Sequence, residues 1–382
     1  MSEPIPQCNP AALVAALRPQ IDAAIARVLD GGPYILGPEV EAFETSWAAW
    51  CDTGQAVGCA NGTDALELIL RALDLPAGSR VLAPSHTAVA TIAAIVRAGH
   101  RPMLADVERH SYCLDPASAS RCFEAAAAAG DPVHALIAVH LYGQPANLDA
   151  LGSLCQIHNI PLIEDGSQAH GARWRGRRVG SWGVAAGFSL YPTKNLGALG
   201  DAGVITTDDP QLAARLKRLR QYGWAQPAIS TEPGVNSRLD PLQAAILQVK
   251  LPHLEAHNAQ RQAVAAVYRQ QLAGQADVML PPAADTRAEP VYHQFVVQLP
   301  AERRDAVRAH LTAQGIGTLL HYPQAAHQMP AYLGQSWVGL DPVGLGVTDA
   351  LLPRIVSLPM GPHLSLEQAA QVAQQLLLTL KG

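Results

Sequence analysis

The chain has 382 residues, of which 49% are apolar, so it can bury a large core and form two domains. Its net charge is −5 and it contains no block of like charges, which argues against a nucleic-acid partner. No stretch approaches about eighteen uninterrupted apolar residues, and the N-terminus lacks the basic and apolar segments of a secretion signal. We therefore expect no membrane segment.

The six cysteines are scattered and include no Cys-x-x-Cys pair. This spacing favours neither a disulfide framework nor a zinc site, so it predicts a cytoplasmic protein. His253 and His257 have the i, i+4 spacing of a helical zinc site. The metalloprotease pattern needs a glutamate directly after the first histidine, and Glu255 comes one place late. We therefore expect no metal.

The first predicted elements are helices over about residues 10–30 and Glu39–Trp50. A strand over Gln55–Ala60, the turn Asn61-Gly62 and a helix over Thr63–Leu73 follow. This arrangement binds phosphate in many proteins, because the first N–H groups of the helix lack partners and the positive end of the helix dipole faces the turn. Many such turns bind nothing, so the pattern alone leaves both interpretations open.

Short apolar strands then alternate with helices. The predicted strands are 80–84, 101–106, 133–139 and 160–165, and the predicted helices are 87–98, 118–129 and 148–158. The alternation predicts a mostly parallel sheet with helices on both faces. Ligands of such sheets bind at the carboxyl ends of the strands, where Asp165, His86 and His140 are expected. A strand-end aspartate is also a common helix cap, which is the alternative for Asp165.

A glycine-rich stretch, Gly187–Gly203, follows and contains a lysine. The chain has only four lysines against twenty-three arginines. We expect three of them to be solvated: Lys217 in a basic run, Lys250 in an amphipathic helix and Lys381 at the C-terminus. Lys194 lies among small and apolar neighbours, where desolvation favours a neutral, nucleophilic amine that can form a Schiff base. The alternative is a loop lysine whose amine reaches solvent.

The pattern changes after residue 208. Predicted helices cover 210–221, 240–249, 254–272, 303–314 and 365–378, predicted strands cover 291–299 and 317–323, and a polar loop covers 223–235. The long helix over 254–272 is expected to bridge two domains. We predict a large domain over residues 1–255 and a small C-terminal domain over residues 256–382.

A strand-end carboxylate, a phosphate-binding turn and a partly buried lysine together suggest pyridoxal 5′-phosphate (PLP). This cofactor needs an amine for its aldehyde, an anion for its pyridinium nitrogen, and N–H or hydroxyl groups for its phosphate. A dinucleotide fingerprint is rejected, because Gly197, Gly200 and Gly203 do not form Gly-x-Gly-x-x-Gly.

Seven motifs carry a resemblance that runs almost from end to end of the chain. They are Gly62-Thr63-Asp64-Ala65-Leu66, Pro84-Ser85-His86-Thr87, His140-Leu141-Tyr142-Gly143-Gln144, Glu164–Gly171, Ser189–Gly197, Asn236–Asp240 and His321-Tyr322-Pro323. In this order they resemble the DegT/DnrJ/EryC1/StrS family of nucleotide-sugar aminotransferases. The resemblance implies the type I PLP fold, similar to aspartate aminotransferase. That fold is α/β, with a large domain around a mostly parallel sheet and a smaller C-terminal α/β domain.

The resemblance also implies roles for single residues. Lys194 resembles the Schiff-base lysine, Asp165 the partner of the pyridine nitrogen, and Gln168 the residue near the ring hydroxyl. The implied phosphate ligands are Gly62, Thr63, Asp64 and Ser189. Asn236 resembles an asparagine that reaches the phosphate from the partner subunit, which implies a homodimer with shared active sites. The alternative is that Asn236 caps a helix in its own subunit.

The substrate side of the site is less defined. His321 and Tyr322 resemble positions near the substrate, and Arg238 is a candidate for the diphosphate, with a structural ion pair as its alternative. Many members place an aromatic residue over the cofactor ring where this chain has Ala88. His86 is a candidate for part of that surface.

The resemblance implies that the enzyme moves an amino group from L-glutamate to a nucleotide-linked keto-sugar. The lysine motif most resembles members that aminate carbon 3 of a dTDP-linked 3-keto-6-deoxyhexose. The alternatives are a 4-keto-sugar, a UDP-linked keto-sugar, and a non-catalytic regulator on the same fold. A regulator would be favoured by loss of the lysine, and a family dehydratase would have histidine there. This chain has Lys194.

Overall fold

The computed structural model describes residues 3–381. Its α-helices are α1 (Pro10–Ala16), α2 (Arg18–Gly31), α3 (Pro38–Trp50), α4 (Gly62–Ala72), α5 (Val89–Arg97), α6 (Pro116–Ala128), α7 (Leu148–His158), α8 (Pro210–Leu219), α9 (Pro241–Lys250), α10 (Leu254–Leu272), α11 (Ala301–Ala313), α12 (Gly346–Leu351) and α13 (Leu366–Lys381). Short 3-10 turns are η1 (Leu141–Gly143), η2 (Leu251–His253) and η3 (Ala326–Gln328).

The strands are β1 (Gln55–Cys59), β2 (Arg80–Pro84), β3 (Arg101–Ala105), β4 (Val133–Val139), β5 (Leu162–Asp165), β6 (Arg173–Trp174), β7 (Arg177–Arg178), β8 (Ala185–Ser189), β9 (Gly203–Thr207), β10 (Trp224–Gln226), β11 (Ile229–Ser230), β12 (Ala288–Glu289), β13 (Phe295–Gln298), β14 (Gly339–Leu340) and β15 (Ile355–Leu358). Eight of them form one sheet in the order β1-β9-β8-β5-β4-β2-β3-β14. All neighbours from β14 to β8 are parallel, and β9 runs antiparallel to β8 and β1. The predicted mostly parallel sheet is confirmed.

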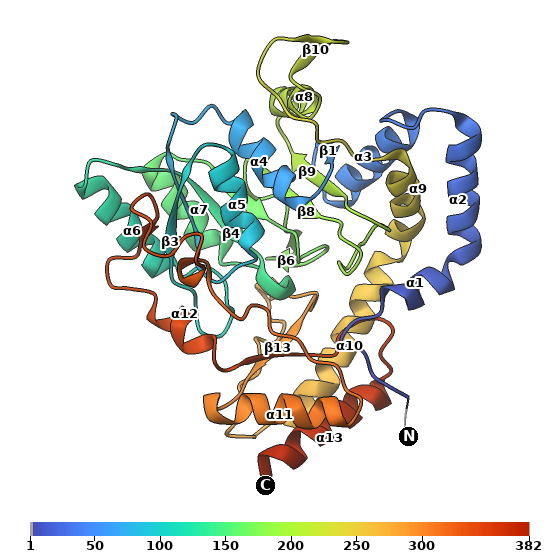
Figure 1. Ribbon diagram of the computed structural model, residues 1–382, viewed down its shortest axis with the longest axis vertical. Coiled ribbons are helices and arrows are strands. Elements are labelled where there is room, and N and C mark those ends of the chain that lie inside the picture. The colour runs from blue at the N-terminus through green and yellow to red at the C-terminus, as the bar shows by residue number, and fades with distance from the viewer. Residues whose placement is uncertain (1–2, 382) are drawn as a thin grey trace.

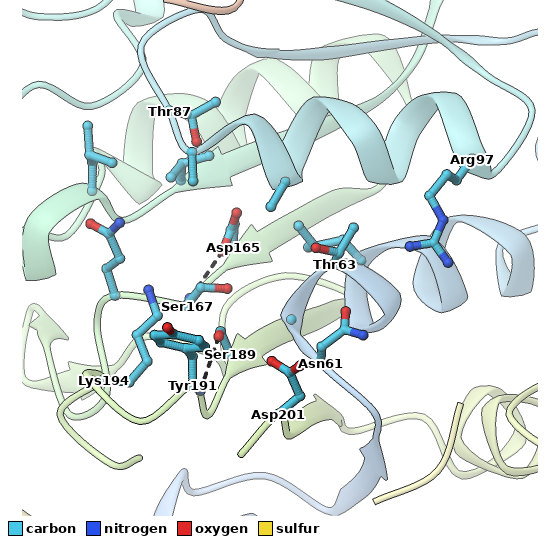
Figure 2. A pocket seen from close by; sticks show the side chains of 17 residues that line it. Asn61, Thr63, Thr87, Arg97, Asp165, Ser167, Ser189, Tyr191, Lys194 and Asp201 are labelled. Atoms are coloured by element: carbon cyan, nitrogen blue, oxygen red, sulfur yellow. Dashed lines mark hydrogen bonds between the residues drawn. The ribbon is translucent and has the colours of Figure 1, made fainter. Parts of the chain in front are cut away.

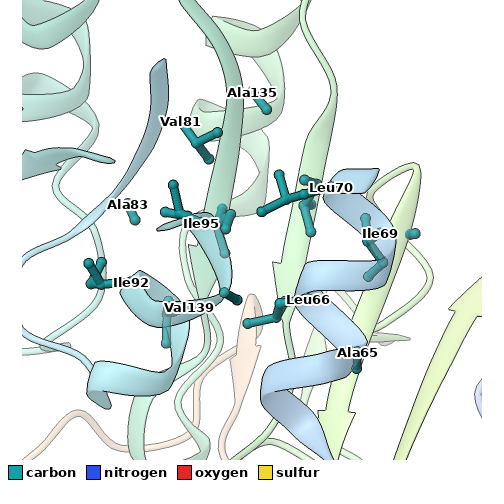
Figure 3. Close-up of a cluster of buried hydrophobic side chains, with 14 of the residues drawn as sticks. Ala65, Leu66, Ile69, Leu70, Val81, Ala83, Ile92, Ile95, Ala135 and Val139 are labelled. Atoms are coloured by element: carbon teal, nitrogen blue, oxygen red, sulfur yellow. The ribbon is translucent and has the colours of Figure 1, made fainter. Parts of the chain in front are cut away.

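Helices cover both faces of this sheet because its strands are apolar on both sides. Along β4, Ala135, Ile137 and Val139 pack in one core with α4, α5 and α8. The intervening Leu136 and Ala138 pack in a second core with α6 and α7. Figure 3 shows α4 and α5 side chains meeting the sheet in the first core. Alternate residues of a strand point to opposite faces, so a continuous apolar run fills both cores.

A third core lies in the C-terminal part of the chain. The antiparallel pair β13 and β15 packs there with α10, α11 and α13. Figure 1 shows α11 and α13 at the bottom, with α10 running down to them from α9. The predicted domain boundary, between residues 255 and 256, falls in the first turn of α10. Ile5 joins the third core, and β14 joins the large sheet, so a segment from each predicted domain crosses this boundary. The boundary itself stays a prediction.

Several predicted elements differ from the structure. The helix expected over residues 10–30 is broken at Leu17, which precedes Arg18 and Pro19, and Pro19 lacks the N–H that a continuous helix requires. The polar loop expected over 223–235 contains the β10–β11 hairpin. The strand expected over 317–323 is reduced to a single bridge between Leu319 and Ser357. No helix within residues 3–381 is long and apolar enough to cross a membrane.

Candidate active site

A cavity of about 400 Å³ lies at the carboxyl ends of the parallel strands. Its walls come from the N-terminus of α4, the start of α5, the end of β5 and the loop between β8 and β9 (Figure 2). The lining residues are Asn61, Gly62, Thr63, Leu66, Thr87, Ala88, Ala90, Arg97, Val139, Leu141, Asp165, Ser167, Gln168, Ser189, Tyr191, Lys194 and Asp201. The volume suits a small organic ligand.

Lys194 enters this cavity from the β8–β9 loop, and Asp165 enters it from the end of β5. The surroundings lower the pKa of Lys194 to about 8, because burial disfavours the ammonium, while the Asp165 carboxylate opposes the shift. Nearby imidazoles are held neutral: burial lowers the pKa of His170 to about 3 and that of His321 to about 4, and the charge of Lys194 adds to both shifts. Lys194 therefore has a lowered pKa and shares its cavity with a carboxylate.

Two hydrogen bonds fix the Asp165 carboxylate, which is 5% exposed. Its Oδ2 accepts from the Thr91 hydroxyl at 2.8 Å, and its Oδ1 accepts from the Ser167 N–H at 3.1 Å. Because the Thr91 proton goes to Asp165, Thr87 donates its own hydroxyl to Thr91 at 3.0 Å. In the described chain β5 is followed by β6 and not by a helix, so the helix-cap alternative for Asp165 is wrong.

Thr91 was not among the site residues predicted from the sequence. Thr91 lies 74 positions from Asp165 in the chain. Only the packing of α5 on the sheet brings the two residues together. A threonine one turn after Thr87 on the same predicted helix was the available signal.

The N-terminus of α4 meets the end of β8 at very short range. A Cβ atom on Gly62 would lie 2.6 Å from the Ser189 Cβ, so only glycine allows this approach. The Asn61 side chain caps the helix by accepting from the Asp64 N–H at 2.9 Å. Gly62, Thr63 and Ser189 line the cavity, and the N–H groups of Gly62 and Thr63, in the first turn of α4, have no partner within the helix. Such a cradle favours an anion.

Asp64 and His86, two of the three predicted cofactor-binding residues that do not line the cavity, lie behind its walls. The Asp64 carboxylate accepts from Ser237 at 2.8 Å and pairs with Arg97 at 3.0 Å. His86 is fully buried, and its Nε2 contacts the Tyr142 hydroxyl at 2.7 Å. Since Tyr142 donates its own proton to the His321 carbonyl, His86 is the donor to Tyr142. Both residues support the cavity walls from behind. In this arrangement neither side chain is placed to contact a cofactor directly.

Gln168 connects the cavity to the C-terminal part of the chain. Its Oε1 accepts from the Tyr142 N–H at 2.7 Å, and its Nε2 donates to the Tyr322 hydroxyl at 2.8 Å. Burial raises the pKa of Tyr322 to about 12. His321 contacts Ser357 at 2.8 Å through Nδ1. Tyr322 and His321 thus stand beside the cavity, although neither belongs to its lining.

Ala88 lines the cavity, at the position where many family members are expected to have an aromatic residue. Around it the wall is aliphatic and is formed by Ala90, Val139 and Leu141. Within the described chain, Tyr191 is the only aromatic residue of the lining. His86 does not supply the missing aromatic surface, because it is buried behind the wall.

Asn236 and Arg238 lie outside the cavity. Asn236 is exposed, and its backbone pairs with Gln221. α9 begins after Asp240, so Asn236 is not the cap of that helix. The Arg238 guanidinium lies over the Tyr222 ring, 6.0 Å from its centre. Within the part of the chain that the structure describes, no carboxylate lies within 4.0 Å of the Arg238 guanidinium, and the role of Arg238 stays a prediction.

One expectation about the lysines needs correction. Lys250 was expected to be solvated but is 8% exposed, because the end of α9 packs beneath the Lys194 loop. Lys217 is half-exposed, as expected, with its amine 3.8 Å from Glu44. The side chain of Lys381 lies outside the described part of the chain.

The residues of the cavity fit PLP. Lys194 offers the amine, Asp165 offers a fixed anion, and the α4 cradle offers donors where a Cβ atom would otherwise fill the space. These three features come from three separate segments of the chain, and the sheet places them around one cavity. The cofactor predicted from the sequence therefore has a suitable site.

Comparisons with known proteins agree with this geometry. Residues 16–377 match the model of the DegT/DnrJ/EryC1/StrS aminotransferase family. The dTDP-3-amino-3,4,6-trideoxy-alpha-D-glucose transaminase of Streptomyces venezuelae is 46% identical over 358 residues, which cover 93% of this chain and 91% of that protein. A UDP-N-acetyl-3-dehydro-alpha-D-glucosamine 3-aminotransferase of Acidithiobacillus ferrooxidans is 39% identical over 99% of this chain and 98% of its own length.

Among solved structures, the crystal structure of DesV from S. venezuelae superposes with a TM-score of 0.92. It is 43% identical and covers 98% of both chains. The predicted fold class, PLP cofactor and aminotransferase activity are thus confirmed at the level of the family. The chain belongs to the DegT/DnrJ/EryC1/StrS aminotransferase family.

Proposed function

We propose that this enzyme transfers the amino group of L-glutamate to carbon 3 of a dTDP-linked 3-keto-6-deoxyhexose. The observation that carries the chemistry is the placement of the Lys194 amine and the Asp165 carboxylate in one cavity. The carbon-3 assignment rests on the lysine motif and on the 46% identity to a protein named as a dTDP-3-amino-sugar transaminase. We include the predicted cytoplasmic location in this proposal.

Lys194 is the proposed acid–base residue. When bound, PLP supplies an aldehyde that takes up an amine and a ring that withdraws electrons. With a pKa of about 8, the Lys194 Nζ can accept a proton near neutral pH and return it, as a general base and acid must. Its place on the cavity wall brings that nitrogen to the reacting groups.

Asp165 and Gln168 are the proposed orienting residues. The Asp165 carboxylate is held by Thr91 and Ser167, so it offers a fixed negative charge to a cationic ring nitrogen. Gln168 has its oxygen committed to the Tyr142 N–H, which turns its amide nitrogen toward Tyr322 and the cavity. We assign the phosphate to Gly62, Thr63 and Ser189, and the neighbourhood of the substrate to His321 and Tyr322.

The substrate is tested by product analysis. The enzyme is supplied with glutamate and either a dTDP-3-keto- or a dTDP-4-keto-6-deoxyhexose, and the new amine is located by NMR. We expect the amine at carbon 3 only. Amination at carbon 4 alone contradicts the regiochemistry and leaves the transaminase assignment standing.

A UDP-linked 3-keto-sugar is the second candidate. It is favoured by the relative that is named for such a substrate and is 39% identical over nearly the whole chain. The same experiment with a UDP-linked 3-keto-hexose separates the two nucleotides. A kcat/KM ratio that favours the UDP compound would replace dTDP in the proposal.

We further propose a homodimer in which Asn236 of each subunit reaches the phosphate of the other. Asn236 is exposed and lies outside the cavity of its own subunit. It follows the β10–β11 hairpin, which projects at the top of Figure 1 and exposes Tyr222 and Ile229. Exposed apolar side chains on a projecting hairpin suit a surface that a second copy covers. Arg238, two residues further on, is then placed near the diphosphate.

A further inference from the structure

Lys250 is a buried lysine that the proposed reaction leaves unexplained. It is the last residue of α9 and is 8% exposed. Burial lowers its pKa to about 8. Within residues 3–381 no carboxylate lies within 4.0 Å of its nitrogen, so no ion pair compensates for burial. Lysine is seldom buried in this way without a specific partner.

The partner of Lys250 is a backbone carbonyl in the Lys194 loop. Its Nζ donates to the Gly197 oxygen at 2.6 Å, in a buried contact. A short hydrogen bond from an ammonium to a carbonyl is stronger than a neutral one. Lys250 therefore fixes one point of the loop that carries Lys194.

Gly197 lies where that loop closes on itself. A Cβ atom on Gly197 would lie 2.5 Å from the Pro192 oxygen, so the two limbs of the turn are in direct contact. The turn is closed by the Lys194 N–H on the Tyr191 oxygen and by the Ala198 N–H on the Leu190 oxygen, both at 2.8 Å. A shift of the Gly197 carbonyl would consequently move the backbone of Lys194.

A small second cavity lies behind the loop. Its volume of about 10 Å³ is close to the space that one water molecule needs. Lys194, Gly197 and Lys250 all line it, together with residues of α1 and His257. Lys194 thus borders both cavities, whereas Lys250 borders only the smaller one.

We propose that Lys250 is a positioning residue that holds the Lys194 turn and sets the direction in which the Lys194 amine enters the main cavity. α9 also holds the loop at its other end, where Gln243 accepts from the Leu199 N–H at 2.8 Å. The helix therefore grips the loop at two points, one from each of its ends. This inference rests on the proposed function of Lys194.

The test compares three full-length variants. Lys250→Met keeps the volume and removes the donor, and Lys250→Gln keeps a donor without the charge. Lys217→Met is the control for losing an exposed lysine, which lies on α8. Amide hydrogen exchange of residues 191–199 is measured in the apoprotein. We expect faster exchange in Lys250→Met, an intermediate rate in Lys250→Gln, and the wild-type rate in Lys217→Met.

The enzyme loaded with PLP gives the second readout. We expect kcat of Lys250→Met to fall by about a hundredfold, with KM within about twofold, because a displaced amine affects the reacting geometry more than substrate binding. The pH at which the absorbance of the bound cofactor is half-changed should also shift in Lys250→Met. Lys250→Gln should recover part of this shift and part of the lost kcat. If Lys250 only filled space, Lys250→Met would retain at least as much activity as Lys250→Gln.

The outcomes separate the two proposals. Unchanged loop exchange, an unchanged absorbance midpoint and near-normal kcat in Lys250→Met would overturn the positioning role. Lys250→Met leaves the buried Gly197 carbonyl without its donor, so its melting temperature should fall by a few degrees, and all variants are compared at a temperature where each is fully folded. If the wild type itself fails to transaminate, the proposed function fails, and the exchange comparison still decides whether Lys250 holds the loop.

Discussion

At the scale of single residues, the proposed chemistry depends on two groups whose surroundings are set by buried neighbours. Lys194 has a pKa of about 8 because burial disfavours its charged form. Asp165 keeps a fixed orientation because Thr91 and Ser167 donate to its two oxygens. The amine and the carboxylate are thus prepared before any ligand arrives.

The pKa of Lys194 predicts how PLP uptake depends on pH. The ordinary value for lysine is 10.5, so at about 8 the amine becomes neutral at lower pH than in an exposed lysine. The rate at which the apoenzyme takes up PLP should rise with pH and reach half its maximum near pH 8. The rate is followed by absorbance, with Nα-acetyl-lysine as the control for titration of PLP itself.

The Asp165 charge raises the pKa of Lys194, so the midpoint should move to lower pH in Asp165→Asn. A wild-type midpoint above about pH 10, where free lysine titrates, would contradict the depressed pKa.

Thr91 provides a second prediction at this scale. Thr91→Val keeps the shape and removes the donor to Asp165. A hydrogen bond to a charged group contributes about 1.5–3 kcal/mol, so we expect kcat to fall by about tenfold or more. Thr45→Val is the control, because Thr45 donates to a helix carbonyl on the surface. Steady-state kinetics equal in the two variants would show that the Thr91 bond does not matter.

At the scale of elements, the site depends on the close approach of α4 and β8. The contact between Gly62 and Ser189 leaves no room for a side chain, so the free N–H groups of α4 and the Ser189 hydroxyl face one point. The hairpin of β8 and β9 then carries the Lys194 loop past this cradle.

We expect Gly62→Ala to weaken PLP binding and to destabilise the apoprotein by about 1–3 kcal/mol, because the new methyl group overpacks against Ser189. Gly152→Ala is the matched control. Gly152 lies in α7, and within the described residues no heavy atom beyond the backbone of that helix comes within 4 Å of the place where the alanine methyl group would lie. Alanine should therefore stabilise α7 by about 0.5–1 kcal/mol. Denaturant unfolding and PLP titration measure both effects. Equal stability of the two variants would contradict the overpacking, because it would show that Ser189 can move away from the added methyl group.

Much of the α/β core could be predicted because its signals are local. The strands from β1 to β5 and the helices between them follow apolar runs and turn residues close to the predicted bounds. β8 and β9 were missed. In β8, Ala185-Ala186-Gly187 lack the bulky residues typical of strands, whereas β9 contains the β-branched run Val204–Thr207, which was an available signal. Their pairing depends on the finished sheet.

Lys194 and Asp165 were predictable because motif and position agreed. The partners of Thr91 and Lys250 were not, because both contacts join segments more than fifty residues apart. Lys250 illustrates the difficulty: an amphipathic pattern places a residue on a face of a helix, and only the packing of the Lys194 loop on the end of α9 decides that its amine is buried.

At the scale of the whole molecule, hydrogen bonds beside the cavity join both parts of the chain, and the cavity has an open side. Gln168 of the large sheet donates to Tyr322 of the C-terminal part, and Tyr142 donates to the His321 carbonyl. Asn236 lies outside this cavity on an exposed segment. A second subunit is the proposed cover of the open side.

Mixing Lys194→Ala with Asn236→Ala subunits tests the shared site. A hybrid dimer would contain one site with both changes and one site with neither, so part of the activity should return. Hybrid formation is checked with two different affinity tags. Hybrids that form and remain inactive would contradict sharing of Asn236.

The central claim is that Lys194 is the amine that holds PLP. The most direct measurement is reduction of the PLP-loaded enzyme with borohydride, followed by digestion and mass spectrometry of the labelled peptide. The account predicts a single PLP label on Lys194 and none in Lys194→Ala. A label on Lys250 or Lys217 in the wild type, or a fully active enzyme without any lysine label, would contradict it.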